Sequence, residues 1–496
     1  MVRLILIFLL IAIVNSTFWM NKEFGEVYPY EFFYHLFFGL NEFTEVNQDY
    51  FFSFIQNGFV LPACASVLIY LIIKFINTAQ VENLFVIKLI DLTNVIFKIR
   101  VLLVLITLSI IWLLFSINIQ ILFTKTHDGD FFKNNYVAPQ LEKILVPKVK
   151  RNLILIFVES LSAEYENTIR YPDDLLKDIK ALTENDTSLQ FKQALHNRWT
   201  QSGIFDSMCG APLKHNFAMR FQDKPREKSW NIFSIFFKPF NSYPKYAPKI
   251  ICLGDVLKHH GYKNIFFGGA DLNFAGKGQF LSQHGYDIAY GKQHWENLGE
   301  RDFNQWGLHD DRLFLQAKKF LLDLDKPAQP FNLTMLTLNL HEPDGFTDTT
   351  CESQNLYDYK GLVKCTDYAL ADFVQFFYAN ELQHSTDLVI LGDHNPRSKK
   401  SLVDGKETDN QFIFNRFISQ TKLQLNRSMT YHFGMFPSIL NMLGFTFPNN
   451  QLGIEPSFFG EAVKESAISK LEPEELNEFI NQYSEFYSKL MYSYEK

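Results

Sequence analysis

The sequence has no excess of positive charge. Its 47 Lys and Arg residues are outnumbered by 54 Asp and Glu residues, which leaves a formal net charge of −7 over 496 residues. Proteins that bind nucleic acid usually present a strongly basic surface, so this composition gives no reason to expect a nucleic acid as partner. The sequence also lacks internal repeats and long low-complexity tracts, which argues against a repeat architecture. A chain of this length is instead expected to contain more than one domain.

Charged residues are scarce in the first 125 positions, where the excess of apolar residues lies. A helix that crosses a bilayer needs about 20 mostly apolar residues. Three stretches are apolar enough: Val2–Met20, Phe59–Ile73 and Val101–Phe123. The first could instead be a signal peptide, although it offers no clear small-x-small cleavage site. We therefore expect a membrane domain over residues 1–123 with about three transmembrane helices.

The loops between these stretches differ in charge. Residues 21–58 contain one Lys and six acidic residues, whereas residues 74–100 contain four basic residues and two acidic ones. Basic loops stay in the cytoplasm, so residues after about 124 are predicted to lie outside, with the chain in the inner (cytoplasmic) membrane as a multi-pass protein. Within the basic loop, residues 81–99 form either an amphipathic helix on the membrane surface or a short buried connector.

Cysteine is rare, with five residues in the whole chain. Cys64 lies in the second apolar stretch, and the other four lie in the region predicted to be outside. An even number in an oxidising compartment suggests two disulfides. We favour Cys351–Cys365, which closes a short loop, and Cys209–Cys252; free thiols are the alternative. Such cysteines fit a periplasm better than a Gram-positive surface.

The remaining sequence divides into a polar linker over 124–150, a domain over 151–464 and a C-terminal helical tail over 465–496. Strand and helix patterns alternate in the domain, which predicts an α/β fold with a central, mostly parallel sheet. The strand candidates are short, apolar and rich in β-branched or aromatic residues, as buried parallel strands are: Leu153–Val158, Asn264–Phe267, Phe331–Leu340 and Leu388–Leu391. The helix candidates are Asp255–His260, Arg312–Asp323 and Thr366–Asn380.

Polar residues with catalytic potential follow these strands. Glu159 follows the first strand, Asp393 and His394 follow the last, and Thr200 begins a helix. Functional groups collect beyond the carboxyl ends of parallel strands, so these four side chains are predicted to converge. Two carboxylates, an imidazole and a hydroxyl suit one Mn²⁺ or Zn²⁺ ion. The metal would activate the Thr200 hydroxyl as a nucleophile and offset charge on a phosphoryl group.

Each of these residues also has a purely structural interpretation. Thr200, followed by Gly203, is most simply a helix N-cap. Glu159 could be a cap or a surface charge, and His341, which follows another strand, could be a satisfied polar residue. Their shared position after successive strands is what favours a common site.

Several motifs in one order resemble the membrane phosphoglycerol transferases. These enzymes include lipoteichoic-acid synthases and the transferases that decorate periplasmic glucans, and they belong to the alkaline phosphatase/sulfatase superfamily. The likeness runs over about 150–445. The motifs are Val158-Glu159-Ser160, Trp199-Thr200-x-x-Gly203, Cys209-Gly210-x-Pro212-Leu213, the segment 253–287, WGLHDDRLF at 306–314, LTLNLHEPDG at 336–345, Gly392-Asp393-His394 and YHFGMFPSILNMLG at 431–444.

The resemblance implies a role for each matching residue. Glu159, Thr200, Asp393 and His394 would hold the metal, with Thr200 as the covalent nucleophile. The basic residue that holds the headgroup phosphate would be Lys277, and the substrate histidine would be His341. Two departures stand out. An aromatic residue that stacks near the headgroup in lipoteichoic-acid synthases falls on Ala275, for which Trp306 or His309 are candidate substitutes. Those synthases also usually have five membrane spans, whereas three are counted here.

The implied reaction transfers phosphoglycerol from a membrane phospholipid, with phosphatidylglycerol as the expected donor, to a hydroxyl of an extracytoplasmic glycan or polymer through a threonine-linked intermediate. A phosphoethanolamine transferase and a non-catalytic, membrane-anchored glycan-binding protein are the alternatives. A sulfatase activity is disfavoured because the sequence lacks the Cys-x-Pro-x-Arg or Ser-x-Pro-x-Arg motif of its modified nucleophile. A two-metal phosphatase is disfavoured because no second Asp/His set is evident.

Overall fold

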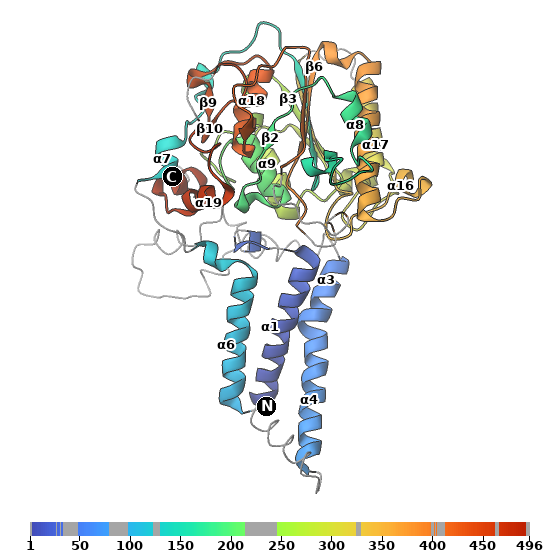
Figure 1. Ribbon diagram of the computed structural model, residues 1–496, viewed down its shortest axis with the longest axis vertical. Coiled ribbons are helices and arrows are strands. Elements are labelled where there is room, and N and C mark those ends of the chain that lie inside the picture. The colour runs from blue at the N-terminus through green and yellow to red at the C-terminus, as the bar shows by residue number, and fades with distance from the viewer. Residues whose placement is uncertain are drawn as a thin grey trace. The chain divides into compact units, whose positions relative to one another are not determined.

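The chain forms two compact units in the computed structural model (Figure 1). The first comprises Met1–Phe32 and Phe43–Phe123, and the second comprises Phe33–Glu42 and Thr124–Lys496. The structure describes residues 2–32 (except 26 and 30), 48–78, 98–122, 129–213, 246–323, 329–397, 401, 403, 412–461 and 466–492. The predicted surface helix or connector at 81–99 lies almost wholly outside these residues.

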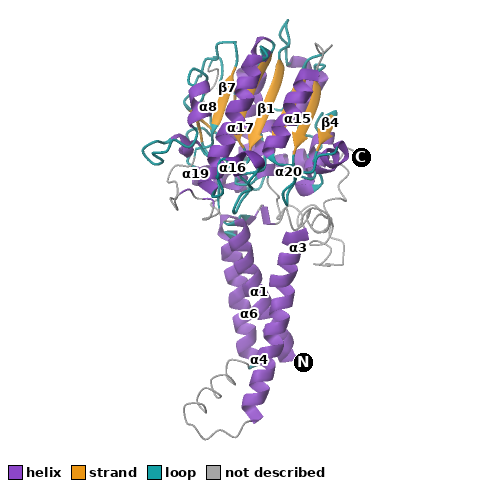
Figure 2. Cartoon of the chain, turned by 90° about the vertical axis from the view of Figure 1, so that its right-hand side faces the viewer, coloured by secondary structure: helices purple, strands orange, loops and turns teal. Residues whose placement is uncertain are grey.

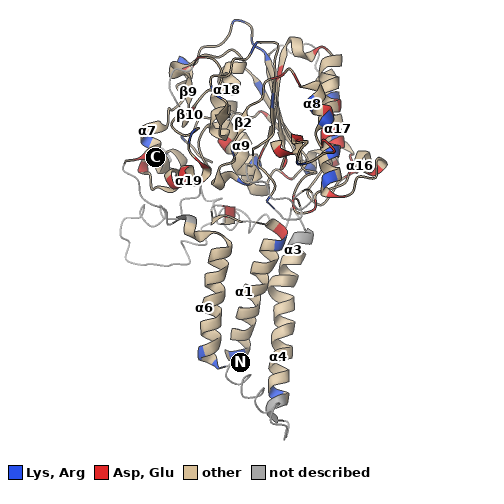
Figure 3. Ribbon diagram, viewed as in Figure 1, with Lys and Arg blue, Asp and Glu red and all other residues tan. Residues whose placement is uncertain are grey.

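Three helices of the first unit are long and apolar enough to cross a membrane: Val2–Phe24, Phe52–Phe75 and Ile99–Ser116. They correspond to the three predicted stretches and comprise α1 (Val2–Phe24), most of α4 (Leu61–Thr78) and α6 (Ile99–Ser116), with α1 in contact with both others. Charged residues on these helices are confined to the regions near their ends (Figure 3). This distribution suits a membrane anchor, since a charge at the bilayer centre is costly.

The second unit is built on a six-stranded sheet in the order β4-β3-β5-β1-β6-β7. The first five strands pair in parallel, and only β7 is antiparallel. This is the α/β fold with a mostly parallel sheet that the sequence predicted. The strands are β1 (Asn152–Val158), β3 (Lys263–Gly268), β4 (Ile288–Tyr290), β5 (Phe331–Leu336), β6 (Thr386–Gly392) and β7 (Asn415–Ile418).

Helices cover both faces of the sheet. Alternate residues of β1 point to opposite sides, so this strand contributes apolar side chains to a core on each face. Leu153, Leu155 and Phe157 enter a core with α9 (Thr200–Cys209), α12 (Leu253–His259), α13 (Lys277–Gln283) and α18 (Met435–Met442). Ile154, Ile156 and Val158 enter a second core with α8 (Lys177–Leu182), α15 (Asp310–Asp323) and α17 (Tyr359–Ala379), which cross the other face (Figure 2). The result is a three-layer domain with two continuous hydrophobic cores.

One predicted strand is too long. β5 ends at Leu336, four residues before the predicted end at Leu340. The next residues leave the sheet because side chains take their backbone groups: Asp310 accepts hydrogen bonds from the backbone N–H of Leu338 (2.7 Å) and of Asn339 (3.0 Å). This early exit turns the chain toward His341 at the end of the sheet.

The predicted linker and tail are both part of the folded domain. Within 124–150, α7 (Phe131–Asn135) buries Phe132 completely, and Leu145 pairs with Thr446 through its backbone. The tail is not a single helix but two, α19 (Pro473–Asn481) and α20 (Glu485–Tyr492). Their apolar sides, including the fully buried Tyr487, join the core that contains α9. Two short amphipathic helices can bury more apolar surface than one straight exposed helix, which explains the break.

The structure pairs Cys209 with Cys252 and Cys351 with Cys365, the pairings that the sequence favoured. The first disulfide joins the end of α9 to the residue before α12, across 43 positions of sequence. We expect the double replacement Cys209→Ala/Cys252→Ala to lower the free energy of unfolding by about 2–4 kcal/mol. Chemical denaturation of the purified chain measures this change, and Cys64→Ala is the control because Cys64 is unpaired. Equal unfolding midpoints for the two variants would contradict the expectation.

Candidate active site

Two neighbouring strands deliver the acidic residues of the candidate site to one edge of the sheet. β1 and β6 run in parallel, with Val158 directly opposite Gly392. Glu159 and Asp393 are the next residues on each strand, so they leave the sheet side by side. Since β5 is the other neighbour of β1, the turn that follows it brings His341 to the same edge. Sheet register therefore explains how residues far apart in sequence meet.

Glu159, Asp393 and His394 form a buried cluster whose ligand atoms all lie within 4.8 Å of one another. His394 Nε2 lies 3.2 Å from Glu159 Oε1 and 3.7 Å from Asp393 Oδ2. The other ring nitrogen, Nδ1, lies 2.9 Å from the carbonyl oxygen of Asn395. That contact orients the ring by holding the proton on Nδ1, which leaves Nε2 toward the carboxylates, as in many metal-binding histidines.

Thr200 lies in this cluster and does not cap its helix. It is the first residue of α9, whose N-cap is Trp199, and no side chain caps that helix. The Thr200 hydroxyl instead donates a hydrogen bond to Glu159 Oε2 at 3.1 Å. The capping interpretation of Thr200 is therefore wrong, and the hydroxyl is directed at the acidic group. The N-terminus of α9 also adds positive potential that favours an anion beside Thr200.

The donor set fits a divalent cation. Asp393 Oδ1 accepts hydrogen bonds from the backbone N–H of Ser160 (2.9 Å) and of His394 (2.7 Å). Asp393 Oδ2 is buried and has no hydrogen-bond partner among the described residues. A buried carboxylate oxygen without a partner is costly, and a metal ion would remove that cost. Carboxylate and imidazole ligands together suit Zn²⁺ or Mn²⁺.

The charges of the cluster also favour a bound divalent cation. Burial and the adjacent Glu159 carboxylate raise the pKa of Asp393 to about 7. Burial opposes the charge of His394, but Asp393 and Glu159 outweigh it and raise the pKa of His394 to about 9. A proton on His394 thus offsets the charge of one of the two carboxylates when no cation is bound. A divalent cation would replace that proton and hold both carboxylates ionised.

Gly203 allows α9 to approach the loop that carries Asp393. A Cβ atom at position 203 would lie 2.1 Å from the carbonyl oxygen of Asp393. We expect Gly203→Ala to push Thr200 away from the cluster, which would lower activity strongly and stability by about 1–3 kcal/mol. Enzyme assays and thermal unfolding measure the two effects. Ser207→Ala, a change at a buried position of the same helix, should leave activity unchanged, and equal activity of both variants would refute this role.

His341 and Trp306 lie beside the cluster. The charges of Glu159 and His394 act on the His341 ring, and burial lowers the pKa of His341. His341 Nδ1 lies 2.9 Å from the carbonyl oxygen of Glu342, and the Trp306 ring centroid lies 4.4 Å from that of His341. His309 is one step further away, with its Nδ1 3.1 Å from Asn339 Oδ1. The structure thus places Trp306 against the predicted substrate histidine.

Lys277 begins α13 and is 6% exposed. The preceding Ala275 has a positive φ of 55° and is also buried. Its neighbour Phe274 packs edge-on against Trp306, with ring centroids 4.9 Å apart. An aromatic side chain is therefore present one residue before the position where the resemblance expected it. The role of Lys277 in headgroup binding stays a prediction.

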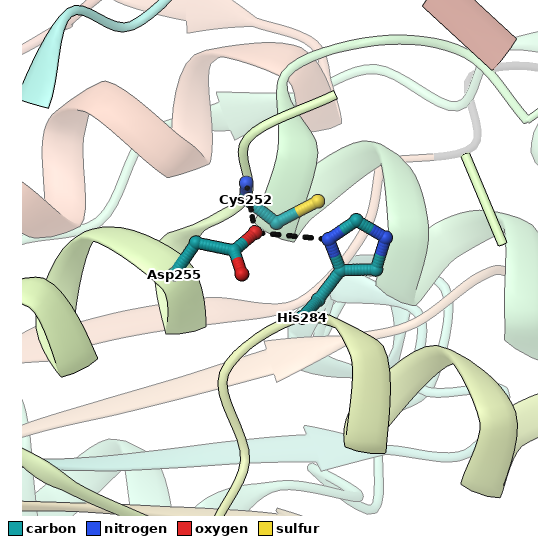
Figure 4. Close-up of side chains that lie close together, drawn as sticks. All are labelled: Cys252, Asp255 and His284. Carbon is teal, nitrogen blue, oxygen red and sulfur yellow. Dashed lines mark hydrogen bonds and ion pairs between the residues drawn. The ribbon is translucent and has the colours of Figure 1, made fainter. Parts of the chain in front are cut away.

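Two other groups of potential metal ligands occur among the described residues, and each contains disulfide cysteines. In the first, Asp255 accepts hydrogen bonds from the backbone N–H of Cys252 and from the ring of His284, both at 2.9 Å (Figure 4). A disulfide sulfur is not a thiolate, so it is a poor metal ligand. Asp255 instead caps α12 and holds His284 in place.

The sequence interpretation missed several residues of the site. Ser160 has a φ of 52°, which lets its N–H reach Asp393 while its hydroxyl donates to Glu159 at 2.9 Å. Arg397 forms a buried ion pair with Glu342 and so joins the loops after β6 and β5. The Glu159-Ser160 dipeptide was a visible signal for the first. The Arg397–Glu342 pair joins residues 55 positions apart, and nothing in the local sequence indicates it.

Residues 151–445 match the Sulfatase family. This is more than half of the chain, which therefore belongs to that family, within the alkaline phosphatase/sulfatase superfamily that its motifs resemble.

Among curated relatives, Phosphoglycerol transferase I of Xanthomonas euvesicatoria pv. vesicatoria (strain 85-10) is 31% identical over 290 residues, which cover 56% of this chain and 39% of the relative. The protein of the same name from Escherichia coli O127:H6 (strain E2348/69 / EPEC) is 32% identical over 287 residues, covering 55% and 34%. The chain thus aligns with little more than a third of each of these relatives.

Two solved structures are similar in outline. The lipoteichoic acid synthase LtaP from Listeria monocytogenes is 17% identical, with a TM-score of 0.47 over 70% of this chain and 80% of the other. Streptococcus pyogenes phosphoglycerol transferase GacH in complex with sn-glycerol-1-phosphate is 16% identical, with a TM-score of 0.41 over 69% and 87%.

Proposed function

We propose that this chain is a membrane-anchored phosphoglycerol transferase that uses one divalent metal ion, Mn²⁺ or Zn²⁺. The observation that carries the proposal is the Thr200 hydroxyl, directed at Glu159 within a buried group that also contains Asp393 and His394. The curated relatives named Phosphoglycerol transferase I support the group that is transferred. The donor would be phosphatidylglycerol, and the acceptor a hydroxyl of a glycan or polymer.

The reaction divides into two steps at one site. The oxygen of Thr200 attacks the phosphorus of the lipid, the bond from phosphorus to the diacylglycerol oxygen breaks, and the hydroxyl proton of Thr200 is balanced by protonation of diacylglycerol. An acceptor hydroxyl then attacks the same phosphorus, its proton returns to Thr200, and the threonine–phosphorus bond breaks. Two displacements at one nucleophile predict ping-pong kinetics.

The metal would lower the pKa of the Thr200 hydroxyl and offset charge on the phosphoryl oxygens. Glu159, Asp393, His394 and Thr200 would hold it. His341 would bind the headgroup: because its Nδ1 faces the carbonyl oxygen of Glu342, its Nε2 is available to accept a hydrogen bond from a glycerol hydroxyl. Trp306 would support that ring by stacking, and Lys277 would pair with the phosphate.

The three apolar helices support a multi-pass anchor in the cytoplasmic membrane. The charge difference between the two loops supports an active site on the periplasmic side, where the two disulfides would be stable. A membrane anchor would also keep the enzyme next to a lipid donor.

The test is mass spectrometry of the purified chain after incubation with phosphatidylglycerol. The expected product is glycerophosphate attached to Thr200. A parallel incubation with phosphatidylethanolamine distinguishes the donors, because modification only by that lipid would make the chain a phosphoethanolamine transferase. No modification by either lipid in protein shown to contain bound metal would overturn the proposal.

A further inference from the structure

A second buried polar cluster lies along α9, one turn beyond Gly203. Its centre is Asp206, six residues after Thr200 on the same helix and completely buried. Asp206 Oδ2 lies 2.7 Å from His196 Nε2 and accepts a hydrogen bond from Asn197 Nδ2 at 2.9 Å. Asp206 Oδ1 accepts from the backbone N–H of Leu213 at 2.8 Å. Both carboxylate oxygens are therefore committed to fixed partners.

Asn197 connects this carboxylate to the loop that carries the metal ligands through Gln193. The amide nitrogen of Asn197 also lies 3.1 Å from Nδ1 of the buried His432. The side-chain oxygen of Asn197 accepts a hydrogen bond from Gln193 Nε2 at 2.6 Å. Gln193 Oε1 in turn accepts from the backbone N–H of Asn395 at 2.8 Å, one residue after His394.

We propose that Asp206 is a positioning residue for transfer: through Asn197 and Gln193 it holds the helix of Thr200 in a fixed position relative to the loop of Asp393 and His394. The two segments are joined by no shared strand, so their relative position depends on packing and on this network. Contact at Gly203 limits how closely they approach, and the network limits how far apart they move. The kinetic test of this role rests on the proposed function. The metal-affinity test rests only on the metal-ligand group.

Replacing Asp206 should have a large effect because the side chains of this network are buried. Asp206, Asn197 and His432 are 0% exposed, and Gln193 is 6% exposed, so a lost hydrogen bond cannot be replaced by solvent. Outer partners of this kind typically change metal affinity or activity by about 10–100-fold when they are replaced. The effect should lower kcat more than it changes KM, because the network positions Thr200 and the metal-ligand loop rather than the residues predicted to bind the headgroup.

The experiment compares Asp206→Asn, Gln193→Met and Asp387→Asn with the unmodified full-length chain. Asp387 is the matched control: its side chain is also 0% exposed, it accepts hydrogen bonds from Arg151 (2.8 Å) and Ser419 (2.7 Å), and it lies at the opposite end of β6 from Asp393. Each protein is measured for thermal unfolding, for affinity in a Mn²⁺ titration, and for kcat and KM with phosphatidylglycerol.

We expect Asp206→Asn to lower kcat and Mn²⁺ affinity by about 10–100-fold with little change in KM, and Gln193→Met to lower both less strongly. Asp387→Asn should lower only the unfolding temperature. If Asp206→Asn does not fold, Gln193→Met decides, because it removes the link to Asn395 without leaving a charge unpaired. Unchanged kcat and unchanged Mn²⁺ affinity in the folded variants would overturn the proposal.

Failure of the proposed function gives a different result. An unmodified chain that transfers nothing from phosphatidylglycerol refutes that function, whereas the Mn²⁺ titration still tests Asp206. In that case a normal affinity in both Asp206→Asn and Gln193→Met overturns the positioning role, and a weakened affinity supports it.

Discussion

Replacement of Thr200 by alanine is expected to abolish transfer, with a loss of about 10³-fold or more, as for other covalent nucleophiles. The hydroxyl of Thr200 is the attacking atom in the proposed reaction, and the structure places it 3.1 Å from Glu159 Oε2. Alanine removes that oxygen and leaves the backbone of α9 unchanged. Transfer of labelled glycerophosphate from phosphatidylglycerol measures the loss, and mass spectrometry should find no modified residue.

Two further variants distinguish loss of the nucleophile from a general disturbance of α9. Thr200→Ser keeps the hydroxyl and should keep most of the activity. Ser202→Ala lies two residues further along α9, is buried, and removes a hydroxyl with no hydrogen-bond partner among the described residues. It should transfer at the normal rate. Full activity of Thr200→Ala would show that another residue is the nucleophile.

Replacement of Asp393 by asparagine is expected to eliminate metal binding, and transfer with it. The amide oxygen of asparagine can still accept the hydrogen bonds from the backbone of Ser160 and His394. Its amide nitrogen would then occupy the place of Oδ2, and an amide nitrogen is not a metal ligand. The loss of affinity should exceed the about 10–100-fold typical of an outer partner, because a direct ligand is removed.

Thermal unfolding adds a readout that does not depend on activity. Metal that binds only the folded chain stabilises it by about 2.7 kcal/mol at a concentration 100 times its dissociation constant. Added Mn²⁺ should therefore raise the unfolding temperature of the unmodified chain and leave that of Asp393→Asn unchanged. Without metal, Asp393→Asn should be at least as stable as the unmodified chain, because it removes a buried carboxylate whose pKa is raised by burial.

Equal metal content in purified Asp393→Asn and in the unmodified chain would contradict the ligand assignment. Glu159→Ala provides a second measurement at the other carboxylate, and Asp387→Asn is the control for loss of a buried aspartate away from the site. A chelator should abolish transfer by the unmodified chain, as Asp393→Asn does. Added Mn²⁺ should restore transfer by the chelator-treated unmodified chain and not by Asp393→Asn.

Local sequence was sufficient for the parts of the fold that depend on local pattern. The apolar run over Val101–Phe123 predicts a membrane helix because its length matches the bilayer. The strand over Leu153–Val158 was identifiable from its continuous apolar residues, and a glutamate directly after such a strand indicates the carboxyl edge of a sheet. The same reasoning found Asp393 and His394, and the order of the motifs indicated the superfamily.

Parts that depend on long-range contacts were not predictable in this way. The segment 124–150 is polar enough to suggest a linker, yet Phe132 is fully buried in the domain core. Thr200 has the signature of a helix cap, and only the position of Glu159, set by β1, shows that the hydroxyl points elsewhere. The network around Asp206 joins four short segments, and nothing in the local sequence indicates that Asp206, Asn197 and Gln193 form hydrogen bonds with one another.

The sequence by itself thus determined the number of apolar helices, the α/β class and the chemical types gathered at the edge of the sheet, because length, periodicity and residue type are local properties of the chain. Only the tertiary structure decided which side chains meet. Parallel register sets Glu159 beside Asp393, contact at Gly203 brings in Thr200, and buried hydrogen bonds through Asn197 connect the nucleophile helix to the ligand loop. Distances of this kind arise from packing between segments, and no single segment encodes them.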